Sequence, residues 1–347
     1  MKLANLLMKL SNLDALPGQE EQVRLALKEE IQLSSQQDAF GNLYFGNLTA
    51  TRKKIAIYAH MDEVGFFVHR ITEEGFVYFY PIGGWWGHVI LGQTVRATCR
   101  KNGYTLKGVV GTLPKENHDM KSVVPINEMY IDFGASSAEE LIAAGLQIGD
   151  MILPDTIANY TFNQQKIIGK ALDNRVACTV MSEVLNQYQG QNCEVIGVAT
   201  VQEEAGTRGS KVAVKNVDAD LNLVIDVANG KDTPKAAQFA NRILGNGPGL
   251  VLADRTALGN LKLLDFIKEI AEEKNLNWQY DLLAGGGTDA GSVQLFNGKP
   301  TLVLCIPVRY CHSWHSIVDL KDIQRTIDLI LAVLEVLDKR SDIFEQF

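Results

Sequence analysis

The sequence predicts an α/β protein, with a mostly parallel sheet flanked by helices and a small all-β domain inserted into it. Two observations support this prediction. Toward both ends of the chain, short apolar runs alternate with amphipathic segments, which is typical of a parallel sheet covered on both faces. Between them, residues 68–160 show little helical periodicity and many short β-rich segments separated by glycines. Residues 1–67 and 161–347 are therefore predicted to form one discontinuous α/β domain, and residues 68–160 an inserted β domain.

Each element of the α/β part has its own signal in the sequence. Residues 18–33 follow a helical period and leave Val23, Leu25, Leu27 and Ile31 available to face a core. The later helices over 174–188 and 319–340 begin behind Asp173 and Asp319, which are good N-caps, and another helix is predicted over 256–274. Continuous apolar runs predict buried strands over 54–60, 194–201, 221–228 and 301–308.

Length and composition exclude several classes of protein. The chain has 347 residues, 46% hydrophobic and 21% charged, which is ordinary for globular proteins. This length accommodates about two domains of roughly 150 residues each. The formal charge of −8 argues against a nucleic acid or an anionic membrane as a partner. No apolar run approaches the roughly 18 residues that span a bilayer.

The cysteines and the N-terminus indicate a reducing compartment. The five cysteines are odd in number and no pair has C-x-x-C spacing, so neither a disulfide framework nor a structural zinc ribbon is expected. A secretory signal would need an unbroken apolar region, but Lys9 interrupts it, and Leu3, Leu6, Leu7 and Leu10 fall on one helical stripe. We expect an amphipathic helix there and a cytoplasmic protein.

Polar side chains follow the predicted strands at their carboxyl ends. Because these ends share one edge of a parallel sheet, the side chains are expected to lie close together. Asp173, which opens a helix, can point to the same edge. The other members come from four strands: His60 and Asp62 after 54–60, Glu203 and Glu204 after 194–201, Asp226 near the end of 221–228, and His312 after 301–308.

Two imidazoles and several carboxylates are ligands for borderline divalent ions such as Zn²⁺, Co²⁺ or Mn²⁺. The cluster holds more ligands than one catalytic zinc needs, and two metal ions sharing a carboxylate account for the number. Such a centre activates water while polarising a carbonyl. A further carboxylate must then act as the general base.

Taken singly, these residues have ordinary explanations. His60 could be a hydrogen-bonded core histidine, Asp173 a helix cap, and Glu203 with Glu204 part of a solvated loop. However, adjacent carboxylates in a crevice repel each other unless a cation lies between them, and Asp226 interrupts an apolar run. The joint pattern favours the metal site. His69, His88 and His118 are weaker candidates, and His315 is a candidate outer-shell residue or substitute ligand.

Seven short motifs together resemble the tetrahedral-type dinuclear metallo-aminopeptidases, the family that includes glutamyl and deblocking aminopeptidases. They occur in the family's order across nearly the whole catalytic part. The motifs are AHMDEVGF at 59–66, PIGGWW at 81–86, GKALDNR at 169–175, VQEEAGTRGS at 201–210, VIDVA at 224–228, GGGTDAGS at 285–292 and VRYCHS at 308–313.

The resemblance implies a role for each residue of the cluster. Asp173 would bridge two metal ions, and Glu203 would be the general base. Asp62 would fix the tautomer and orientation of His60. The remaining ligands would form one pair for each metal, His60 with Asp226 and Glu204 with His312.

The resemblance also implies an activity and partners. The chain would remove N-terminal residues from short peptides with a free N-terminus, using two divalent ions per subunit, zinc or cobalt foremost and manganese as a further option. The catalytic domain would have the zinc-peptidase fold. The β domain inserted after the first metal histidine would serve oligomerisation, in dimers that assemble into a hollow tetrahedral dodecamer.

Several residues bear on the substrate preference of the pocket. Leu172 stands where relatives often carry Trp or another bulky residue. The loop at 284–291 is expected to line the substrate channel, with Thr288 and Asp289 as candidate contacts. A preference for acidic residues would need a basic side chain, for which the candidates are Lys235, Arg255 and Arg309.

Three alternatives compete with this interpretation. A related two-metal carboxypeptidase or N-acyl amino-acid deacylase would use a similar ligand set and differ in which end of the substrate is processed. A glycoside hydrolase needs two carboxylates and no metal, which leaves His60, His312 and Asp173 unexplained. A non-catalytic relative would be expected to have lost at least one ligand.

Overall fold

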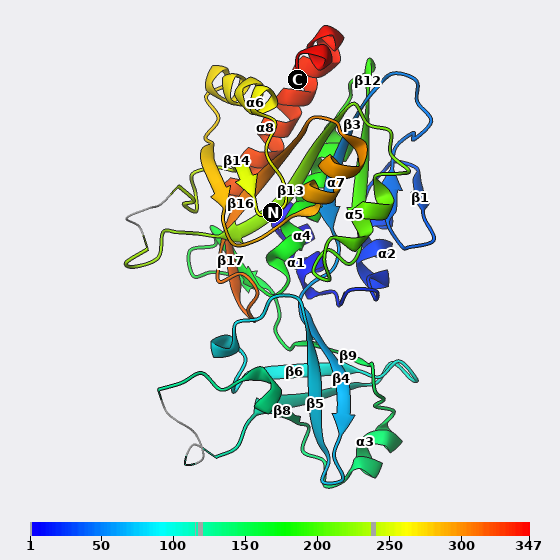
Figure 1. Ribbon diagram of the computed structural model, residues 1–347, viewed down its shortest axis with the longest axis vertical. Coiled ribbons are helices and arrows are strands. Elements are labelled where there is room, and N and C mark those ends of the chain that lie inside the picture. The colour runs from blue at the N-terminus through cyan, green and yellow to red at the C-terminus, as the bar shows by residue number, and fades with distance from the viewer. Residues whose placement is uncertain (1, 115, 117–120, 237–240) are drawn as a thin grey trace.

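The chain folds into an α/β body with a β-barrel projecting from one end (Figure 1). The structure is a computed structural model and describes residues 2–114, 116, 121–236 and 241–347. The predicted fold class, a mostly parallel sheet flanked by helices with a small all-β insert, is confirmed. In the described part of the chain, no helix is both long and apolar enough to cross a membrane.

The α/β body is organised around a sheet in which the described residues form 11 strands. Its centre is the parallel set β12-β3-β13-β16, and shorter, mostly antiparallel strands extend both edges. The strands are β1 (Ser35–Gln37), β2 (Leu43–Phe45), β3 (Lys53–His60), β10 (Asn159–Tyr160), β11 (Lys166–Gly169), β12 (Cys193–Thr200), β13 (Leu221–Asn229), β14 (Gly249–Asp254), β15 (Gln279–Leu283), β16 (Thr301–Arg309) and β17 (Ser316–Asp319).

Helices cover both faces of this sheet. The alternation along β3 shows the division, because Ile55 and Ile57 join the larger core while Ala56 and Tyr58 join the smaller one. Such alternation lets one strand bury side chains on both sides. The larger core is closed by α1 (Lys2–Asn12), α2 (Glu21–Glu30), α4 (Leu172–Gln187), α6 (Leu261–Glu273) and α8 (Leu320–Lys339), and the smaller one by α5 (Arg208–Ala213) and α7 (Asp289–Asn297).

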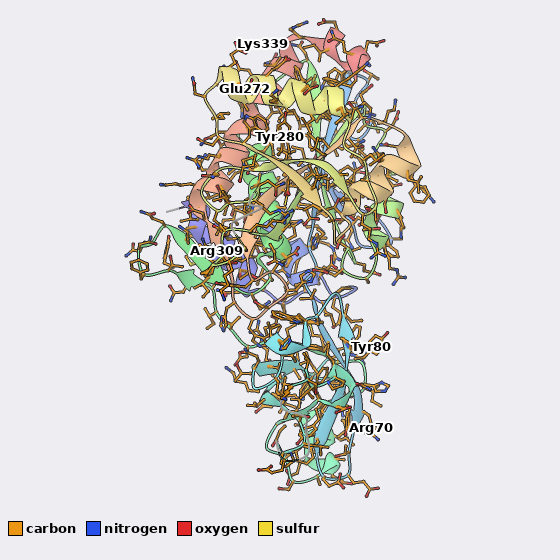
Figure 2. The ribbon with its side chains drawn as sticks, turned by 60° about the vertical axis from the view of Figure 1, so that its left-hand side comes forward. Arg70, Tyr80, Glu272, Tyr280, Arg309 and Lys339 are labelled. Carbon is orange, nitrogen blue, oxygen red and sulfur yellow. The ribbon has the colours of Figure 1, made fainter. Side chains whose placement is uncertain are left out.

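The barrel is a closed antiparallel sheet with its own core, inserted between β3 and β10. Figure 2 shows Arg70 and Tyr80 on this slender part, whereas Tyr280 and Arg309 lie on the α/β body. The short α3 (Ala138–Ala144), which the sequence did not predict, packs at the barrel. The barrel strands are β4 (Gly65–Ile71), β5 (Phe76–Ile82), β6 (Thr94–Thr98), β7 (Thr105–Gly111), β8 (Tyr130–Asp132) and β9 (Met151–Pro154).

Three predictions about the helices can be compared with the structure. The helix predicted over 256–274 begins at Leu261, because the Asn260 side chain caps it by accepting from the Leu263 amide. Leu25 in α2 is 50% exposed and does not join the core that Val23 enters. The predicted cap at Asp319 is confirmed, since its side chain accepts from the Lys321 amide.

Candidate active site

The side chains that the sequence predicted to converge do meet at the carboxyl edge of the parallel strands. His60 is the last residue of β3, and Asp226 lies within β13. They open onto a cleft of about 1050 Å³ between the sheet edge and the barrel. The same cleft is lined by Asp173, Glu203, Glu204 and His312.

Asp173 lies at the centre of the cluster. Its Oδ1 is 3.1 Å from His60 Nε2, and its Oδ2 is 3.1 Å from His312 Nε2. The expectation that Asp173 caps a helix is wrong. Its backbone (φ −84°, ψ 106°) interrupts the first turn of α4, and the Asn174 side chain instead accepts a bond from the Ala177 amide. The carboxylate of Asp173 is thereby free to face both imidazoles.

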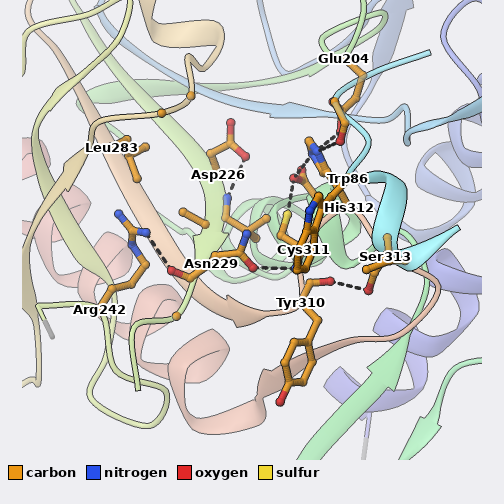
Figure 3. Close-up of a pocket in the computed structure, with 18 of the residues that line it drawn as sticks. Trp86, Glu204, Asp226, Asn229, Arg242, Leu283, Tyr310, Cys311, His312 and Ser313 are labelled. Carbon is orange, nitrogen blue, oxygen red and sulfur yellow. Dashed lines mark hydrogen bonds and ion pairs between the residues drawn. The ribbon is translucent and has the colours of Figure 1, made fainter. Parts of the chain in front are cut away.

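Two groups of potential ligands share Asp173. On one side, Asp226 Oδ1 lies 3.9 Å from Nε2 of the buried His60. On the other, Glu204 Oε1 lies 3.1 Å from His312 Nε2. Figure 3 shows Glu204 and His312 together on one side of the cleft, with Asp226 on the other. The geometry therefore offers two adjacent sites, each with one imidazole and two carboxylates.

The donor atoms fit cations better than they fit one another. Glu204 Oε1 is buried and lies 3.1 Å from an imidazole nitrogen, yet it has no hydrogen-bond partner. This is the arrangement expected of two ligands that point at a common cation. Placing the buried Asp226 beside the half-buried Asp173 and Glu204 is also costly unless positive charge compensates them. Imidazole and carboxylate donors suit Zn²⁺, Co²⁺ and Mn²⁺.

The pKa shifts follow from this crowding of charges. Burial works to raise the pKa of Asp173, but hydrogen bonds from His312 and His60 hold it well below its ordinary value. Burial and the neighbouring charge of Asp173 raise the pKa of Asp226 well above its ordinary value. Burial opposes protonation of His312, but Glu204 and Asp173 raise its pKa to about 12. Each shift reflects strong interaction among closely spaced charged groups.

Asp62 contacts residues on both sides of the ligand cluster. Its Oδ1 accepts from the Glu203 amide and its Oδ2 from the Glu204 amide, each at 3.0 Å. Its backbone oxygen lies 3.1 Å from His60 Nδ1, the nitrogen that faces away from Asp173. A hydrogen bond donated from Nδ1 would leave the Nε2 lone pair available to a cation. Asp62 is fully buried, so it orients its neighbours and does not line the cleft.

The loop that carries the two glutamates is held in a strained conformation. Gln202 has a φ of 55°, which is unfavourable for a residue other than glycine. Its amide donates to Glu20 Oε1, so that three consecutive amides, those of residues 202–204, are held by the carboxylates of Glu20 and Asp62. Burial raises the pKa of Glu203 well above its ordinary value. A carboxylate whose proton affinity is raised in this way accepts a proton more readily than an exposed one.

The barrel holds His312 in place. Its Nδ1 contacts the backbone oxygen of Gly84 at 2.7 Å. Two residues further on, Trp314 is buried in the barrel core and donates its indole N–H to Thr94. His312 itself has a φ of 54°, a conformation that these contacts must hold.

Sequence reasoning missed several residues of the cleft. Cys311 lies 3.0 Å from Asp173 Oδ2, although nothing in the cysteine spacing marked it. Trp86, for which the PIGGWW motif was the available signal, reaches the cleft from the barrel together with His88, which the sequence had marked only as a weaker candidate. Lys231 also lines the cleft, and within the residues that the structure describes its ammonium group has no partner.

The basic residues expected to face an acidic substrate do not line the cleft. Arg309 is paired with Asp232 at 2.7 Å, and Arg255 and Lys235 are exposed outside it. Arg242 does line the cleft, but it is buried and forms an ion pair with Asp281. The sequence could not show this, because burial and pairing depend on the fold.

The remaining candidates divide between the cleft wall and other places. Residues 284–288 line the cleft, as expected for the glycine-rich loop. Thr288 caps α7 and donates to Asp254, and Asp289 is buried against Thr200. His315 also lines the cleft, but its Nδ1 lies 3.3 Å from Thr156 Oγ1, outside both ligand groups. His69 belongs to β4, away from the cleft, and His118 lies outside the described residues.

Comparison with known proteins gives a consistent result. The profile of a family described as M42 glutamyl aminopeptidase matches residues 41–329. The putative aminopeptidase FrvX of Escherichia coli (strain K12) is 34% identical, over 99% of this chain and 98% of that protein. A TET aminopeptidase from the marine sediment archaeon Thaumarchaeota archaeon SCGC AB-539-E09 superposes with a TM-score of 0.90 at 32% identity, over 96% of each chain. The TET1 peptidase of Pyrococcus horikoshii, which can assemble into a tetrahedron or a large octahedral shell, gives 0.84 at 28% identity, over 95% of this chain and 98% of that one.

Proposed function

The chain belongs to the M42 glutamyl aminopeptidase family, and from that premise we propose that it removes N-terminal residues from short peptides with the help of two divalent cations. The predicted enzyme class is confirmed: the protein is an aminopeptidase, a hydrolase of peptide bonds that depends on divalent metal. The number of cations, their ligands and the substrates are our proposal. The observation that carries it is the Asp173 carboxylate, which faces an imidazole with each oxygen.

We propose that His60, Asp173 and Asp226 hold the first cation and that Asp173, Glu204 and His312 hold the second. When bound, the two cations supply a Lewis-acidic centre that activates water and polarises the peptide carbonyl. Zinc and cobalt suit these donors best, and manganese is a further option. The two groups of contacts that share Asp173 support this division of the ligands.

Glu203 is the proposed general base. It lines the cleft beside both ligand groups but belongs to neither. Its carboxylate takes the proton of the attacking water and delivers it to the leaving amine. Burial holds the pKa of Glu203 well above its ordinary value, which brings its proton affinity closer to that of the groups it serves. Asp62 keeps the base in position through its bond to the Glu203 amide.

The remaining parts of the proposal concern organisation. We divide the chain into a catalytic domain of residues 1–67 and 161–347 and a barrel domain of residues 68–160 that mediates self-association; the first barrel strand already begins at Gly65, and β10 (Asn159–Tyr160) pairs with the sheet of the α/β body. Dimers that assemble into a tetrahedral dodecamer are expected, and the ability of the P. horikoshii TET1 peptidase to assemble into a tetrahedron supports this. The five cysteines are free thiols, which supports a cytoplasmic location.

A hydrolysis assay tests the proposed function. Protein stripped of metal is incubated with aminoacyl-p-nitroanilides, short peptides and matched N-acetylated peptides, with and without Co²⁺ or Zn²⁺. We expect metal-dependent release of the N-terminal residue from free-amine substrates alone. Release from the C-terminus would favour a carboxypeptidase, cleavage of blocked substrates alone would favour a deacylase, and metal-independent cleavage of soluble cellulose would favour a glycosidase.

Lys231 is expected to favour acidic N-terminal residues, because its ammonium group lines the cleft without a partner among the described residues. A hydrogen bond to a charged group contributes about 1.5–3 kcal/mol. Lys231→Met should therefore lower kcat/KM for the glutamyl anilide relative to the leucyl anilide by roughly tenfold or more. Lys235→Met, outside the cleft, is the matched control. An unchanged ratio in Lys231→Met would show that Lys231 does not contact the N-terminal side chain.

A further inference from the structure

Cys311 places a thiol against the proposed bridging carboxylate. Its Sγ lies 3.0 Å from Asp173 Oδ2, and the residue lines the cleft immediately before His312 (Figure 3). The backbone of the loop that carries Cys311 is constrained. Tyr310 has a φ of 60°, and the Cys311 amide donates to the Asn229 side chain at 2.8 Å. The thiol is therefore fixed beside the cluster by its surroundings.

Three chemically different donors converge at this point. One ligand atom each from Asp173, Cys311 and His312 lie within 4.8 Å of one another, close enough to bind a single cation. Glu204 Oε1 lies 3.1 Å from His312 Nε2, although it does not belong to this group of mutually close atoms. A sulfur, a nitrogen and a carboxylate oxygen around one point form a donor set typical of zinc and of ions that resemble it.

The other side of the cluster provides an internal comparison. Cys178 lies close to the first ligand group, but its thiol donates to the backbone oxygen of His60 at 3.1 Å. The group of His60, Asp173 and Asp226 contains no sulfur. Two thiols therefore lie near the two proposed cations, and only Cys311 faces the ligand atoms themselves.

We propose that Cys311, bound as the thiolate, is a protein ligand of the second cation, together with Asp173, Glu204 and His312. The inference rests on the proposed two-cation function and adds a ligand that this function does not need. It makes the two sites unequal, with three protein ligands at the first and four at the second. A thiolate favours zinc and cobalt over manganese and magnesium, so the second site becomes the more selective one.

Cobalt substitution tests this proposal, because a cobalt–thiolate bond produces a charge-transfer absorption band in the near ultraviolet. Full-length protein stripped of metal is titrated with Co²⁺ until two ions are bound per subunit. We expect the band to grow as the second site fills, to disappear in Cys311→Ser, and to persist in the matched control Cys178→Ser. Absence of the band in the fully loaded wild-type protein would overturn the proposal without recourse to any variant.

A competition experiment distinguishes ligation from a merely structural thiol. Loss of a ligand should lower the zinc affinity of one site in Cys311→Ser by at least roughly 10–100-fold, while manganese affinity changes little. Equal losses for both ions, or none, would mean that the thiol only donates a hydrogen bond to Asp173. If the wild-type protein bound no cobalt at all, the two-cation function itself would fail. Binding and activation by cobalt without the band would refute only the role of Cys311.

Discussion

Glu203→Gln is expected to reduce kcat by roughly 10²–10⁴-fold while both cations remain bound. Glutamine keeps the size of the side chain but cannot accept the proton of the attacking water. The proposed ligands are left untouched, since Glu203 belongs to neither ligand group. The Asp62 bond to residue 203 involves the backbone amide, so it also survives the substitution. Steady-state assays give kcat and elemental analysis gives the metal content, so the two effects are measured separately.

Glu204→Gln is the matched control, because it changes the same group at the next residue. Glu204 Oε1 faces His312 Nε2 at 3.1 Å, so this variant should lose the second cation and keep the first. The two neighbouring substitutions thus predict opposite metal contents. If Glu203→Gln lost a cation, Glu203 would be a ligand and the base would have to be sought elsewhere in the cleft.

Asp173→Asn is expected to release both cations together and to abolish activity. The loss of activity should exceed roughly 10⁴-fold, the largest loss expected when an acid–base group is removed. Each carboxylate oxygen of Asp173 faces a different imidazole. An amide has only one oxygen and carries no charge, so it can compensate neither site fully. Elemental analysis after gel filtration gives the metal content, and circular dichroism checks that the variant is folded.

Asp226→Asn separates the bridge from a single ligand. Asp226 lies 3.9 Å from His60 Nε2 and belongs only to the first group, so its variant should lose one cation and keep the other. Retention of two tightly bound cations by Asp173→Asn would remove Asp173 from the bridging position. Loss of both cations by Asp226→Asn would show that the sites do not fill independently.

The parts of the fold and of the site that follow from a local sequence pattern could be predicted. The strands β3, β12, β13 and β16 are long apolar runs, and their carboxyl ends locate the proposed ligands without knowledge of the fold. Shorter strands such as β1, with three exposed residues, carry no such pattern. They are defined by their pairing partners, which periodicity does not reveal.

The rest depends on tertiary contacts. Asp173 has the sequence context of a helix cap, and only the interruption of the first turn of α4 turns it toward the imidazoles. Cys311 and Lys231 gain their importance from what surrounds them, since one lies against the Asp173 carboxylate and the other in a cleft without a partner among the described residues. Single-sequence patterns do not contain that information.

The contacts between the barrel and His312 bear on how this protein can be rearranged by evolution or by an engineer. The insert supplies the Gly84 oxygen to one imidazole nitrogen and the packing space for Trp314. Deleting the barrel, or exchanging it for that of a relative, would leave His312 without either support. The barrel is therefore not a domain that can be exchanged by itself. We expect the PIGGWW segment and the loop from Tyr310 to Trp314 to be transferable only together.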